Sequence, residues 1–387
     1  MKTLGIVTAS RAEYGLLRPF IEELRRHEET GELSVRLIVT GTHLAEAYGS
    51  TVKEIENDGL RIDERVPIPV KTDNALAIAK NQAETLTAFT ALFMKEQYDA
   101  VILLGDRYEM LMVAIAATNT LTPLIHISGG DTTEGAVDES IRHSITKMSY
   151  YHFTTNADSR RRVIQLGESP ERVFEVGSTS LDNILRLPLL EKEEAVRGFL
   201  PEDCARYALS TYHPVTLEDQ DVRKDILAWV NAMKQFPDIH FIVTKTGADR
   251  GGELANEILT AETEGVSHIH VYGSLGVLRY LSLMKYASFV LGNSSSGIVE
   301  VPAFHIPTIN IGDRQRGRLQ SESIINCGTS AEEITDAIRL ALSEPMREKA
   351  VRAVSPYGDG HAAEKMTDIL LQKLWEPVDL KKTFYDL

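Results

Sequence analysis

Cysteine is almost absent from this chain of 387 residues, which contains only Cys204 and Cys327. Two cysteines so far apart cannot build a disulfide framework or a thiolate metal site, and such sparse use is typical of a reducing compartment. The chain also lacks the long apolar run that a signal peptide or a membrane span requires. We therefore expect a cytoplasmic protein that does not insert into a membrane.

Positive charge is also in short supply, since 41 Lys and Arg face 56 Asp and Glu, for a formal net charge of -15. Proteins that bind nucleic acids through phosphates carry a basic surface, so we expect no nucleic-acid partner. A small anionic ligand stays compatible with this charge where a few basic residues converge. The hydrophobic content of 43% is that of an ordinary globular protein with a sizeable core.

The length and the order of apolar runs predict two domains of the α/β class. Short β-branched runs alternate with amphipathic stretches, which is typical of βαβ units and parallel sheets. The runs form two sets, at residues 4–9, 35–40, 100–105 and 124–128, and at residues 207–211, 239–244, 269–272, 289–292 and 308–311. We predict two doubly wound Rossmann-like domains facing a cleft, at residues 1–180 and 181–360, and a C-terminal helix with a tail at residues 361–387.

The stretch Asn293-Ser294-Ser295-Ser296-Gly297 is the most informative in the chain. An apolar run at residues 289–291 predicts a buried strand before it, and residues 298–301 can open a helix after it. A turn of small residues at this junction points backbone N–H groups at the helix N-terminus, where anions bind. An ordinary capped turn has the same pattern, so the prediction of a phosphate-binding turn at residues 293–297, called the seat below, also depends on basic residues elsewhere in the chain. Glu300 would lie about two helical turns below the seat, within reach of a ribose.

Basic residues follow several of the predicted strands. Arg11 follows the first strand and Arg107 the third, while His213 and Arg314 follow strands of the second set. The carboxyl ends of parallel strands meet at one edge of a sheet, where ligands of open α/β folds bind. These side chains are therefore candidates to neutralise a diphosphate, a task that suits the arginine fork in particular.

Acidic residues are densest after the fourth predicted strand, from Asp131 to Glu139. Acids in the first turn of a helix often serve only to cap it and to complement its dipole, and we favour that interpretation for Glu139. Asp131, Glu134 and Asp138 lie in a glycine-flanked segment at the carboxyl end of a strand. For these three we favour a catalytic role.

Five motifs together carry a resemblance that covers nearly the whole chain: SRAEYG at 10–15, GDRYE at 105–109, IRHSITKMS at 141–149, GNSSSGIVE at 292–300 and INIGDRQ at 309–315. In their order and spacing the chain resembles the hydrolysing UDP-N-acetylglucosamine 2-epimerases, most closely the branch of the bacterial sialic-acid pathway. The resemblance implies the two-domain fold of the B-type (GT-B) glycosyltransferases. In that fold the C-terminal helix usually crosses back to the first domain.

The resemblance also assigns roles to matching positions. It implies that Asp106 and Asp138 carry the chemistry, with Arg142 and His43 in support. Its nucleotide positions, the seat included, fall on Arg11, Arg107, His213, Asn293, Ser294, Ser295, Ser296, Gly297, Glu300 and Arg314. No nicotinamide is required and no metal-ligand cluster of suitable spacing is present, while a loosely bound magnesium ion stays open. The expected partners are a UDP-sugar and further copies of the chain, in a homodimer or a homotetramer.

The chain departs from the family pattern at two places. Many relatives read His-Ile-Glu-Gly-Gly-Glu where this chain has His126-Ile127-Ser128-Gly129-Gly130-Asp131, so an essential carboxylate is missing at Ser128. Asp131 and Glu134 are the candidates to replace it, and we favour Glu134 because its longer side chain reaches further into the cleft. The segment Gly247-Ala248-Asp249 lacks the asparagine that relatives often place before Ala-Asp, which would alter or remove one nucleotide contact.

The resemblance implies that the enzyme converts UDP-N-acetylglucosamine and water into N-acetylmannosamine and UDP, through a 2-acetamidoglycal. Four other interpretations stay open. The same chemistry on a UDP-2,4-diacetamido-trideoxyhexose would fit the departure at Ser128. A non-hydrolysing epimerase and a glycosyltransferase of the same fold are less favoured, the latter because the acids from Asp131 to Asp138 exceed the need for one base. A nucleotide-sugar sensor without catalysis is disfavoured because Asp106 and Asp138 are both present.

Overall fold

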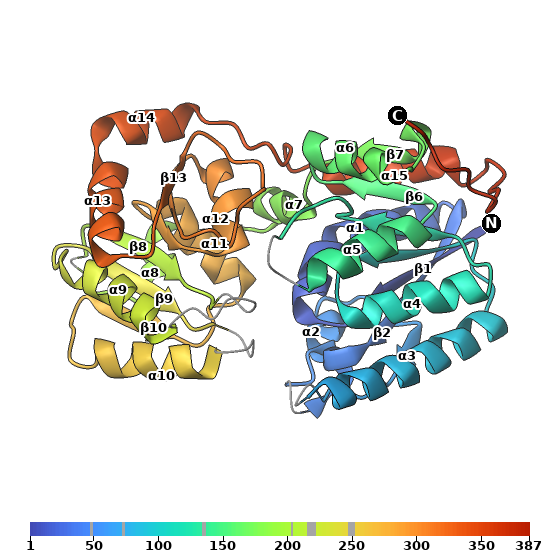
Figure 1. Cartoon of the computed structure of the whole chain (residues 1–387), viewed down its shortest axis with the longest axis horizontal. Coiled ribbons are helices and arrows are strands. Elements are labelled where there is room, and N and C mark those ends of the chain that lie inside the picture. The colour runs from blue at the N-terminus through green and yellow to red at the C-terminus, as the bar shows by residue number, and fades with distance from the viewer. Residues whose placement is uncertain (47–48, 72–73, 134–136, 203, 215–221, 247–251) are drawn as a thin grey trace. The chain divides into compact units, whose positions relative to one another are not determined.

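In a computed structural model the chain forms two α/β units, each built on its own parallel sheet (Figure 1). The structure describes residues 1–46, 49–71, 74–133, 137–202, 204–214, 222–246 and 252–387. The second unit comprises residues 184–356 together with Thr132 and Thr133; the chain leaves the first unit inside helix α7 (Thr179–Arg186) and returns to it at Tyr357. The predicted fold class, two doubly wound parallel α/β sheets, is confirmed.

The first unit contains a seven-stranded sheet. Its strands are β1 (Lys2–Thr8), β2 (Leu33–Thr40), β3 (Glu64–Val66), β4 (Ala100–Leu104), β5 (Leu124–Ile127), β6 (Tyr151–Thr154) and β7 (Val173–Glu175). Their order in the sheet is β3-β2-β1-β4-β5-β6-β7, and all pairs are parallel. The direction of winding reverses between β1 and β4, where Leu4 pairs with Ala100 and Ile6 with Ile102. Ligands of such sheets bind beyond the carboxyl ends of the strands at this reversal.

Helices cover both faces of the first sheet. They are α1 (Arg11–Glu29), α2 (Val52–Asn57), α3 (Ala75–Lys95), α4 (Tyr108–Asn119), α5 (Asp138–Met148), α6 (Ala157–Gln165) and α15 (Ala362–Lys373), with the 3-10 turns η1 (Gly41–Leu44) and η3 (Pro170–Arg172). Successive side chains of a strand point to opposite faces. Ile102 and Leu104 of β4 therefore join a core with α1 and α15, whereas Val101 and Leu103 join a second core with α3 and α4. Figure 1 shows α3, α4 and α5 lying side by side.

The C-terminal helix α15 is part of the first unit, where it packs against α1. Met366 and Leu370 on its inner face are buried in the core that α1 also lines. The buried carboxylate of Asp182, on α7, accepts hydrogen bonds from the N–H groups of Ala362 at 3.0 Å and Ala363 at 2.9 Å. Because these N–H groups open α15 and have no partner within the helix, Asp182 caps it from a distant part of the chain.

The second unit repeats the same winding on a six-stranded parallel sheet. Its strands are β8 (Tyr207–Thr211), β9 (His240–Thr244), β10 (Ile269–Tyr272), β11 (Val290–Gly292), β12 (Thr308–Ile311) and β13 (Ile324–Cys327). The order is β10-β9-β8-β11-β12-β13, so the reversal falls between β8 and β11. Its helices are α8 (Lys192–Val196), α9 (Val222–Lys234), α10 (Gly252–Thr263), α11 (Val277–Tyr286), α12 (Ser295–Val299), α13 (Ala331–Leu342) and α14 (Glu344–Arg352), with the 3-10 turn η4 (Val301–Phe304).

Four strands of the structure were not predicted: β3, β6, β7 and β13. Strands β3 and β7 are only three residues long and lie at the edges of the first sheet, too short for a periodicity to be visible. Strand β13 lies at the edge of the second sheet and is only partly buried. Strand β6 is fully buried, but it has only four residues and begins three positions after the end of α5.

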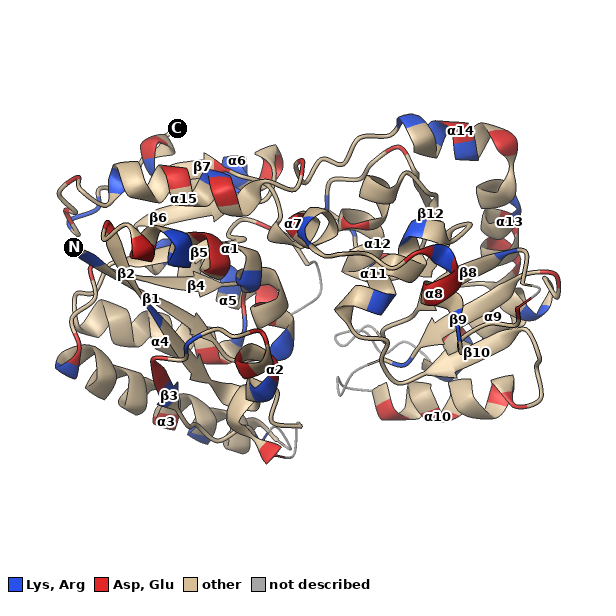
Figure 2. Cartoon of the chain, turned by 180° about the vertical axis from the view of Figure 1, so that it is seen from behind, with Lys and Arg blue, Asp and Glu red and all other residues tan. Residues whose placement is uncertain are grey.

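Acidic and basic residues are mixed along the helices of each unit (Figure 2). On α1, for example, Arg18 donates to Glu22 and Arg26 donates to Glu23, both at 2.8 Å. Pairs of this kind on a helix contribute only about 0.3 to 0.5 kcal/mol each. In the described part of the chain, no helix combines the length and the apolar character that crossing a membrane requires.

Candidate active site

The loop after β1 is fixed by a capping box formed by Ser10 and Glu13. The Ser10 hydroxyl accepts from the Glu13 N–H at 3.4 Å, and the Glu13 carboxylate accepts from the N–H groups of Ser10 at 3.1 Å and Ala9 at 2.8 Å. These bonds satisfy N–H groups that have no partner within α1. They set Arg11 on the first turn of the helix, where its side chain is 43% exposed and lies 3.2 Å from the Glu54 carboxylate.

Arg107 follows β4 and lies between two buried carboxylates. Its guanidinium donates to Glu109 at 2.8 Å, and its Nε lies 3.9 Å from Glu13 Oε1. Burial raises the pKa of Glu13 to about 7, although the charge of Arg107 opposes that shift. Within the described residues, Glu13 Oε1 and Glu109 Oε2 are buried without a hydrogen-bond partner. The predicted phosphate ligand Arg107 is thus oriented by two acids that the sequence patterns did not single out.

Asp106 and Arg142 form the central ion pair of the first unit. Asp106 follows β4, and Arg142 Nη2 reaches its carboxylate from α5 through a short hydrogen bond. Arg142 Nη1 also donates to the Asp131 carbonyl at 2.7 Å and to the Glu139 carboxylate at 2.8 Å. The Arg142 side chain is only 3% exposed, whereas that of Asp106 is 27% exposed. One buried arginine therefore ties the loops after β4 and β5 to α5 and leaves a carboxylate partly open to a ligand.

The carboxylate of Asp131 is hydrogen-bonded to side chains of its own unit. Its carboxylate accepts from the hydroxyls of Thr155 at 2.5 Å and Ser159 at 2.7 Å, and both donors are buried. These bonds anchor the loop after β5 to the start of α6. The other candidate, Glu134, lies outside the described residues. Ser128, where the family pattern has glutamate, has a φ of 64°, in the left-handed region that side chains seldom occupy.

Asp138 is the first residue of α5 and is exposed. It precedes Arg142 by one helical turn, so both predicted site residues lie on the same face of the helix. Glu139 was predicted to serve the helix dipole. Besides lying in the first turn, it accepts from Arg142 and lies 3.3 Å from the Nε2 of His143.

His43 lies in the turn η1 after β2 and is fully buried. Its Nε2 is 3.1 Å from the Thr8 hydroxyl, and its Nδ1 is 2.9 Å from the Thr51 hydroxyl. Burial lowers the pKa of His43 to about 4, so the ring is neutral near pH 7. Both ring nitrogens are thus engaged by hydroxyls, and a catalytic role for His43 stays a prediction.

His126, on β5, is a residue of this unit that the sequence patterns missed. Its Nε2 is 2.8 Å from the Gly105 carbonyl, and its Nδ1 is 3.1 Å from the Thr146 hydroxyl on α5. Burial lowers the pKa of His126 to about 3, so a neutral ring joins the two groups. Because Gly105 has a φ of 81° and directly precedes Asp106, the ring supports the turn that presents this carboxylate. Its position near the carboxyl end of a strand was the available signal.

In the second unit, Asn293 follows β11 and holds the loop after β8. Its Oδ1 accepts from the His213 N–H, and its Nδ2 donates to the His213 carbonyl, both at 2.7 Å. Arg314 and Gln315, after β12, donate to the Asn293 carbonyl at 3.0 Å and 2.8 Å. Loops from three neighbouring strands therefore meet beside the reversal of the sheet. Gln315 is buried and was missed, although it directly follows Arg314 in the sequence motif.

The serine turn continues from Asn293 into the short helix α12. Ser294 is its N-cap and accepts from the Ser296 N–H at 3.4 Å. Glu300 closes the helix after only five residues, and its partly buried carboxylate takes a short hydrogen bond from the Ser296 hydroxyl. Burial raises the pKa of Glu300. Glu300 thus follows Ser296 by one helical turn, and η4, which begins at Val301, comes directly after it.

The small residues of α12 allow the helix to approach the sheet closely. Ser295 is exposed on the first turn. Gly297 is buried, its carbonyl accepts from the Thr308 hydroxyl at 2.8 Å, and a Cβ at this position would come within 2.9 Å of the Thr308 side chain. The seat thus keeps its backbone N–H groups close to the end of the sheet.

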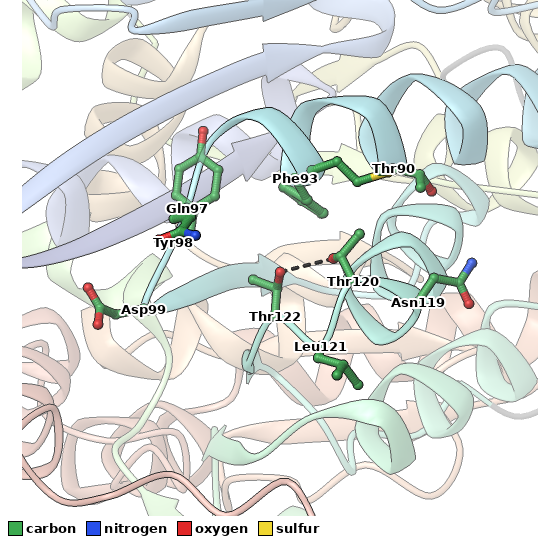
Figure 3. Close-up of a pocket in the computed structure, with 10 residues that line it drawn as sticks. Thr90, Phe93, Gln97, Tyr98, Asp99, Asn119, Thr120, Leu121 and Thr122 are labelled. Carbon is green, nitrogen blue, oxygen red and sulfur yellow. Dashed lines mark hydrogen bonds between the residues drawn. The ribbon is translucent and has the colours of Figure 1, made fainter.

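One pocket of the first unit lies away from these residues. The pocket of about 590 Å³ in Figure 3 is lined by Asp99 and Thr122, which directly precede β4 and β5, and by Phe93 and Met94 of α3. It lies at the amino ends of the strands, and none of the predicted site residues lines it. Among the residues that the structure describes, no group of three His, Cys, Asp or Glu side chains is placed to hold a metal ion.

Sequence comparison decides the family. The model of the UDP-N-acetylglucosamine 2-epimerases matches residues 24–371, which is most of the chain. The chain belongs to this family. It is therefore a nucleotide-sugar 2-epimerase whose substrate is a UDP-sugar, and the resemblance seen in the five sequence motifs is confirmed.

Relatives and solved structures agree with this assignment. The chain is 40% identical over 326 residues to the GDP/UDP-N,N'-diacetylbacillosamine 2-epimerase (hydrolyzing) of Campylobacter jejuni, covering 84% of each chain. It is 37% identical to the polysialic acid biosynthesis protein P7 of Escherichia coli, over 100% of this chain and 98% of that protein. The crystal structure of UDP-GlcNAc 2-epimerase from Neisseria meningitidis bound to UDP-GlcNAc aligns with a TM-score of 0.82 at 19% identity, covering 96% of this chain and 100% of that one. That last likeness concerns the fold.

Proposed function

We propose that this 2-epimerase is of the hydrolysing type and converts UDP-N-acetylglucosamine and water into N-acetylmannosamine and UDP. The observation that carries the proposal is the ion pair of Asp106 with the buried Arg142. It holds a partly open carboxylate beside the reversal of the first sheet, where the reaction needs a group that bears negative charge and accepts a proton.

The first step is elimination of UDP. The hydrogen on carbon 2 of an N-acetylhexosamine is not next to a carbonyl carbon, so it is lost only as the bond from carbon 1 to UDP breaks. The diphosphate leaves with the electron pair of that bond, and carbon 1 gains positive charge. Asp106 stabilises this charge in the proposed site, and a carboxylate takes the proton of carbon 2, which leaves the 2-acetamidoglycal. Arg107 and Arg11 are the proposed partners of the departing diphosphate in the first unit.

The second step adds water across the glycal. An acid returns a proton to carbon 2 from the opposite face while water attacks carbon 1, which releases the manno sugar. Asp138 and Glu134 are the proposed groups besides Asp106, because two carboxylates in different environments can divide the roles of base and acid. The carboxylate of Asp131 already accepts from Thr155 and Ser159, which favours Glu134 in its place.

The UDP moiety is assigned to the second unit. The turn from Asn293 into α12 offers backbone N–H groups. The guanidinium of Arg314 lies beside this turn, because it donates a hydrogen bond to the Asn293 carbonyl. His213 belongs to the same group of loops, because Asn293 bonds to its backbone on both sides. We assign Glu300, one turn further on, to the ribose hydroxyls.

A UDP-2,4-diacetamido-trideoxyhexose is the second candidate substrate for the same chemistry. Ser128 replaces the family's glutamate beside the predicted sugar site, so the surroundings of the ring differ there. The relative from Campylobacter jejuni is named for diacetylbacillosamine, whereas the one from Escherichia coli is named for polysialic acid. The two identities, 40% and 37%, do not separate the sugars.

A proton NMR time course in deuterated water, run in parallel on the two UDP-sugars, tests the proposal. With UDP-N-acetylglucosamine we expect release of UDP, appearance of the free manno sugar and deuterium at carbon 2. Turnover of the diacetamido sugar alone would select the second candidate. A product that still carries UDP would show a non-hydrolysing epimerase.

Two further outcomes separate the remaining functions. Release of UDP only after a sugar acceptor is added would show a glycosyltransferase. Tight binding of both UDP-sugars without any turnover would show a sensor. Either result would refute the hydrolysing reaction, because that reaction needs no co-substrate except water.

A further inference from the structure

The chain ends in a tail without helix or strand that packs against the end of α5. After α15 the tail runs from residue 374 to residue 387, and Lys382 is its most deeply placed charge, with a side chain only 16% exposed. The Lys382 ammonium donates to the carbonyls of Lys147 at 2.8 Å and Ser149 at 2.6 Å. The last carbonyls of a helix have no partner within it and carry partial negative charge, so a cation placed there stabilises the helix end.

The same ammonium belongs to a buried ionic cluster. Lys382 donates to both carboxylate oxygens of Glu168 at 2.9 Å, and Lys147 on α5 donates to one of them at 2.8 Å. The Nε2 of His152 lies 3.2 Å from the other. Burial alone raises the pKa of Glu168, but the hydrogen bonds from His152, Lys147 and Lys382 outweigh it and lower the pKa to about 2. The Glu168 carboxylate is therefore ionised and joins the tail to α5.

The residues after Lys382 hold the tail in place. The Phe384 ring lies 4.8 Å from the Lys147 ammonium and packs on Gly167, where a Cβ would come within 2.3 Å of the ring. The Tyr385 N–H donates to the Gly167 carbonyl at 3.0 Å. The tail thus docks through backbone, ring and charge contacts on both sides of Glu168.

Helix α5 links this cluster to the proposed site. It has 11 residues, with Asp138 at its first position, Arg142 in the middle and Lys147 near its end. A helix of this length transmits a shift along its axis to all of its side chains. Since Arg142 holds Asp106, a displacement of the C-terminal end of α5 would also move that ion pair.

We propose that Lys382 is a positioning residue for the reaction, which acts by capping α5 and so fixing Arg142 against Asp106. This inference rests on the proposed function, because it assigns the reaction to residues that α5 carries or holds. In this proposal Lys382 contacts neither Arg142 nor Asp106 and takes no part in binding UDP. Its removal should therefore affect the chemical step and leave nucleotide affinity unchanged.

The test compares Lys382→Met with Lys381→Met, which removes the same charge one position earlier from an exposed side chain. We expect Lys382→Met to lower kcat about tenfold while KM stays within about twofold, as for a small displacement of reacting groups. Lys381→Met should behave as the wild type. If Lys382→Met does not fold, Lys382→Gln, which keeps a donor without the charge, serves the same comparison with the same split expected.

Hydrogen exchange of the peptide that contains α5 gives a readout independent of turnover. Its amides should exchange faster in Lys382→Met than in Lys381→Met, because the helix end has lost its cap. Unchanged kcat in Lys382→Met, even with a lower melting temperature, would overturn the proposal, and so would unchanged exchange. If the wild type turns over neither UDP-sugar, the proposed function fails, whereas the exchange comparison still tests whether Lys382 anchors α5.

Discussion

At the scale of single residues, the proposed reaction depends on the carboxylate of Asp106. We expect Asp106→Asn to lower kcat by at least ~100-fold with little change in UDP affinity, because an amide neither carries the charge that stabilises carbon 1 nor accepts a proton. The amide keeps the size of the carboxylate and an oxygen for Arg142. Steady-state release of UDP measures kcat, and titration calorimetry measures the affinity.

Asp99→Asn is the matched control, since Asp99 precedes the same strand at its opposite end. There it accepts from Lys2 at 2.8 Å and from the Thr3 N–H at 2.7 Å. Its replacement should leave kcat within about twofold of the wild type. A wild-type kcat in Asp106→Asn would remove Asp106 from the catalytic groups.

Glu13 gives a prediction about pH. Burial raises its pKa from an ordinary 4.5 to about 7. Between these two pH values the folded protein keeps a proton on Glu13 that the unfolded chain has already released. The stability that this proton confers is present below pH 4.5 and is lost as pH rises through 7. Relative to Glu13→Gln, the wild type should therefore lose about 2 to 3 kcal/mol of unfolding free energy between about pH 5 and pH 8.

Urea unfolding of both proteins at the two pH values measures this difference. Glu29→Gln, at the exposed end of the same helix, is the control, and its difference from the wild type should not grow with pH. A constant difference between Glu13→Gln and the wild type across this range would show that Glu13 is ionised throughout.

Side-chain partners were the part of the site that the sequence could not predict. The order of strands and polar turns located Asp106, Arg107 and the serine turn, because ligands of open parallel sheets gather at the carboxyl ends of strands. The sequence does not show that Asn293 uses its amide on the backbone of His213, nor that Asp131 uses its carboxylate on two buried hydroxyls. Those choices depend on contacts between segments far apart in the chain.

At the scale of elements, the start of α15 depends on a carboxylate from α7. We expect Asp182→Ala to reduce the unfolding free energy by about 1 to 3 kcal/mol, because the N–H groups of Ala362 and Ala363 lose their buried acceptor. Chemical unfolding followed by far-UV circular dichroism measures the loss.

Asp368→Ala is the control for this change, since Asp368 is exposed on the same helix. It should alter the unfolding free energy by no more than about 0.5 kcal/mol. Equal stabilities of the two variants would mean that Asp182 does not hold α15 in place.

The long strands could be predicted and the short ones could not. Strand β4, for example, is buried on both faces and its sequence, AVILL, is a continuous apolar stretch. Strands β3 and β7 have three residues each and exist because a neighbouring strand offers free hydrogen-bonding groups. Local sequence carries little of that information. The early end of α12 has a similar origin, since it follows from Pro302 and from the packing of Gly297 on Thr308.

At the scale of the whole molecule, UDP should stabilise the folded chain through the loops of the second unit. A ligand at 100 times its Kd adds about 2.7 kcal/mol to the unfolding free energy of the protein it binds. Arg314→Ala should weaken UDP binding by roughly 1.5 to 3 kcal/mol, the usual contribution of a hydrogen bond to a charged group. Thermal unfolding at increasing UDP concentration should therefore need roughly 10- to 150-fold more UDP for the same shift in Tm.

Arg339→Ala is the control, because Arg339 lies on α13 and pairs with Asp336 on the same helix. It removes one positive charge from the same unit and should leave the UDP response unchanged. If Arg314→Ala responds to UDP as the wild type does, the nucleotide binds elsewhere.

The two sheets share one strand order although the sequence shows no internal repeat. In each, the first three strands are added in one direction and the remaining strands in the other, so the reversal lies between the first and the fourth strand. This architecture was predictable, because alternating apolar runs and amphipathic stretches recur twice along the chain. What the pattern could not indicate is that the first sheet has one strand more than the second, namely β7.

The return of the chain to its first unit at Tyr357 determines the order in which a ribosome can complete the protein. Residues 184–356 emerge as an uninterrupted stretch, so the second sheet can assemble during translation. The core under α1 stays uncovered on the side of Met366 and Leu370 until the codons for α15 have been translated. The first unit is therefore begun first and completed last. A premature stop codon before α15 would leave the apolar core under α1 exposed to other nascent chains.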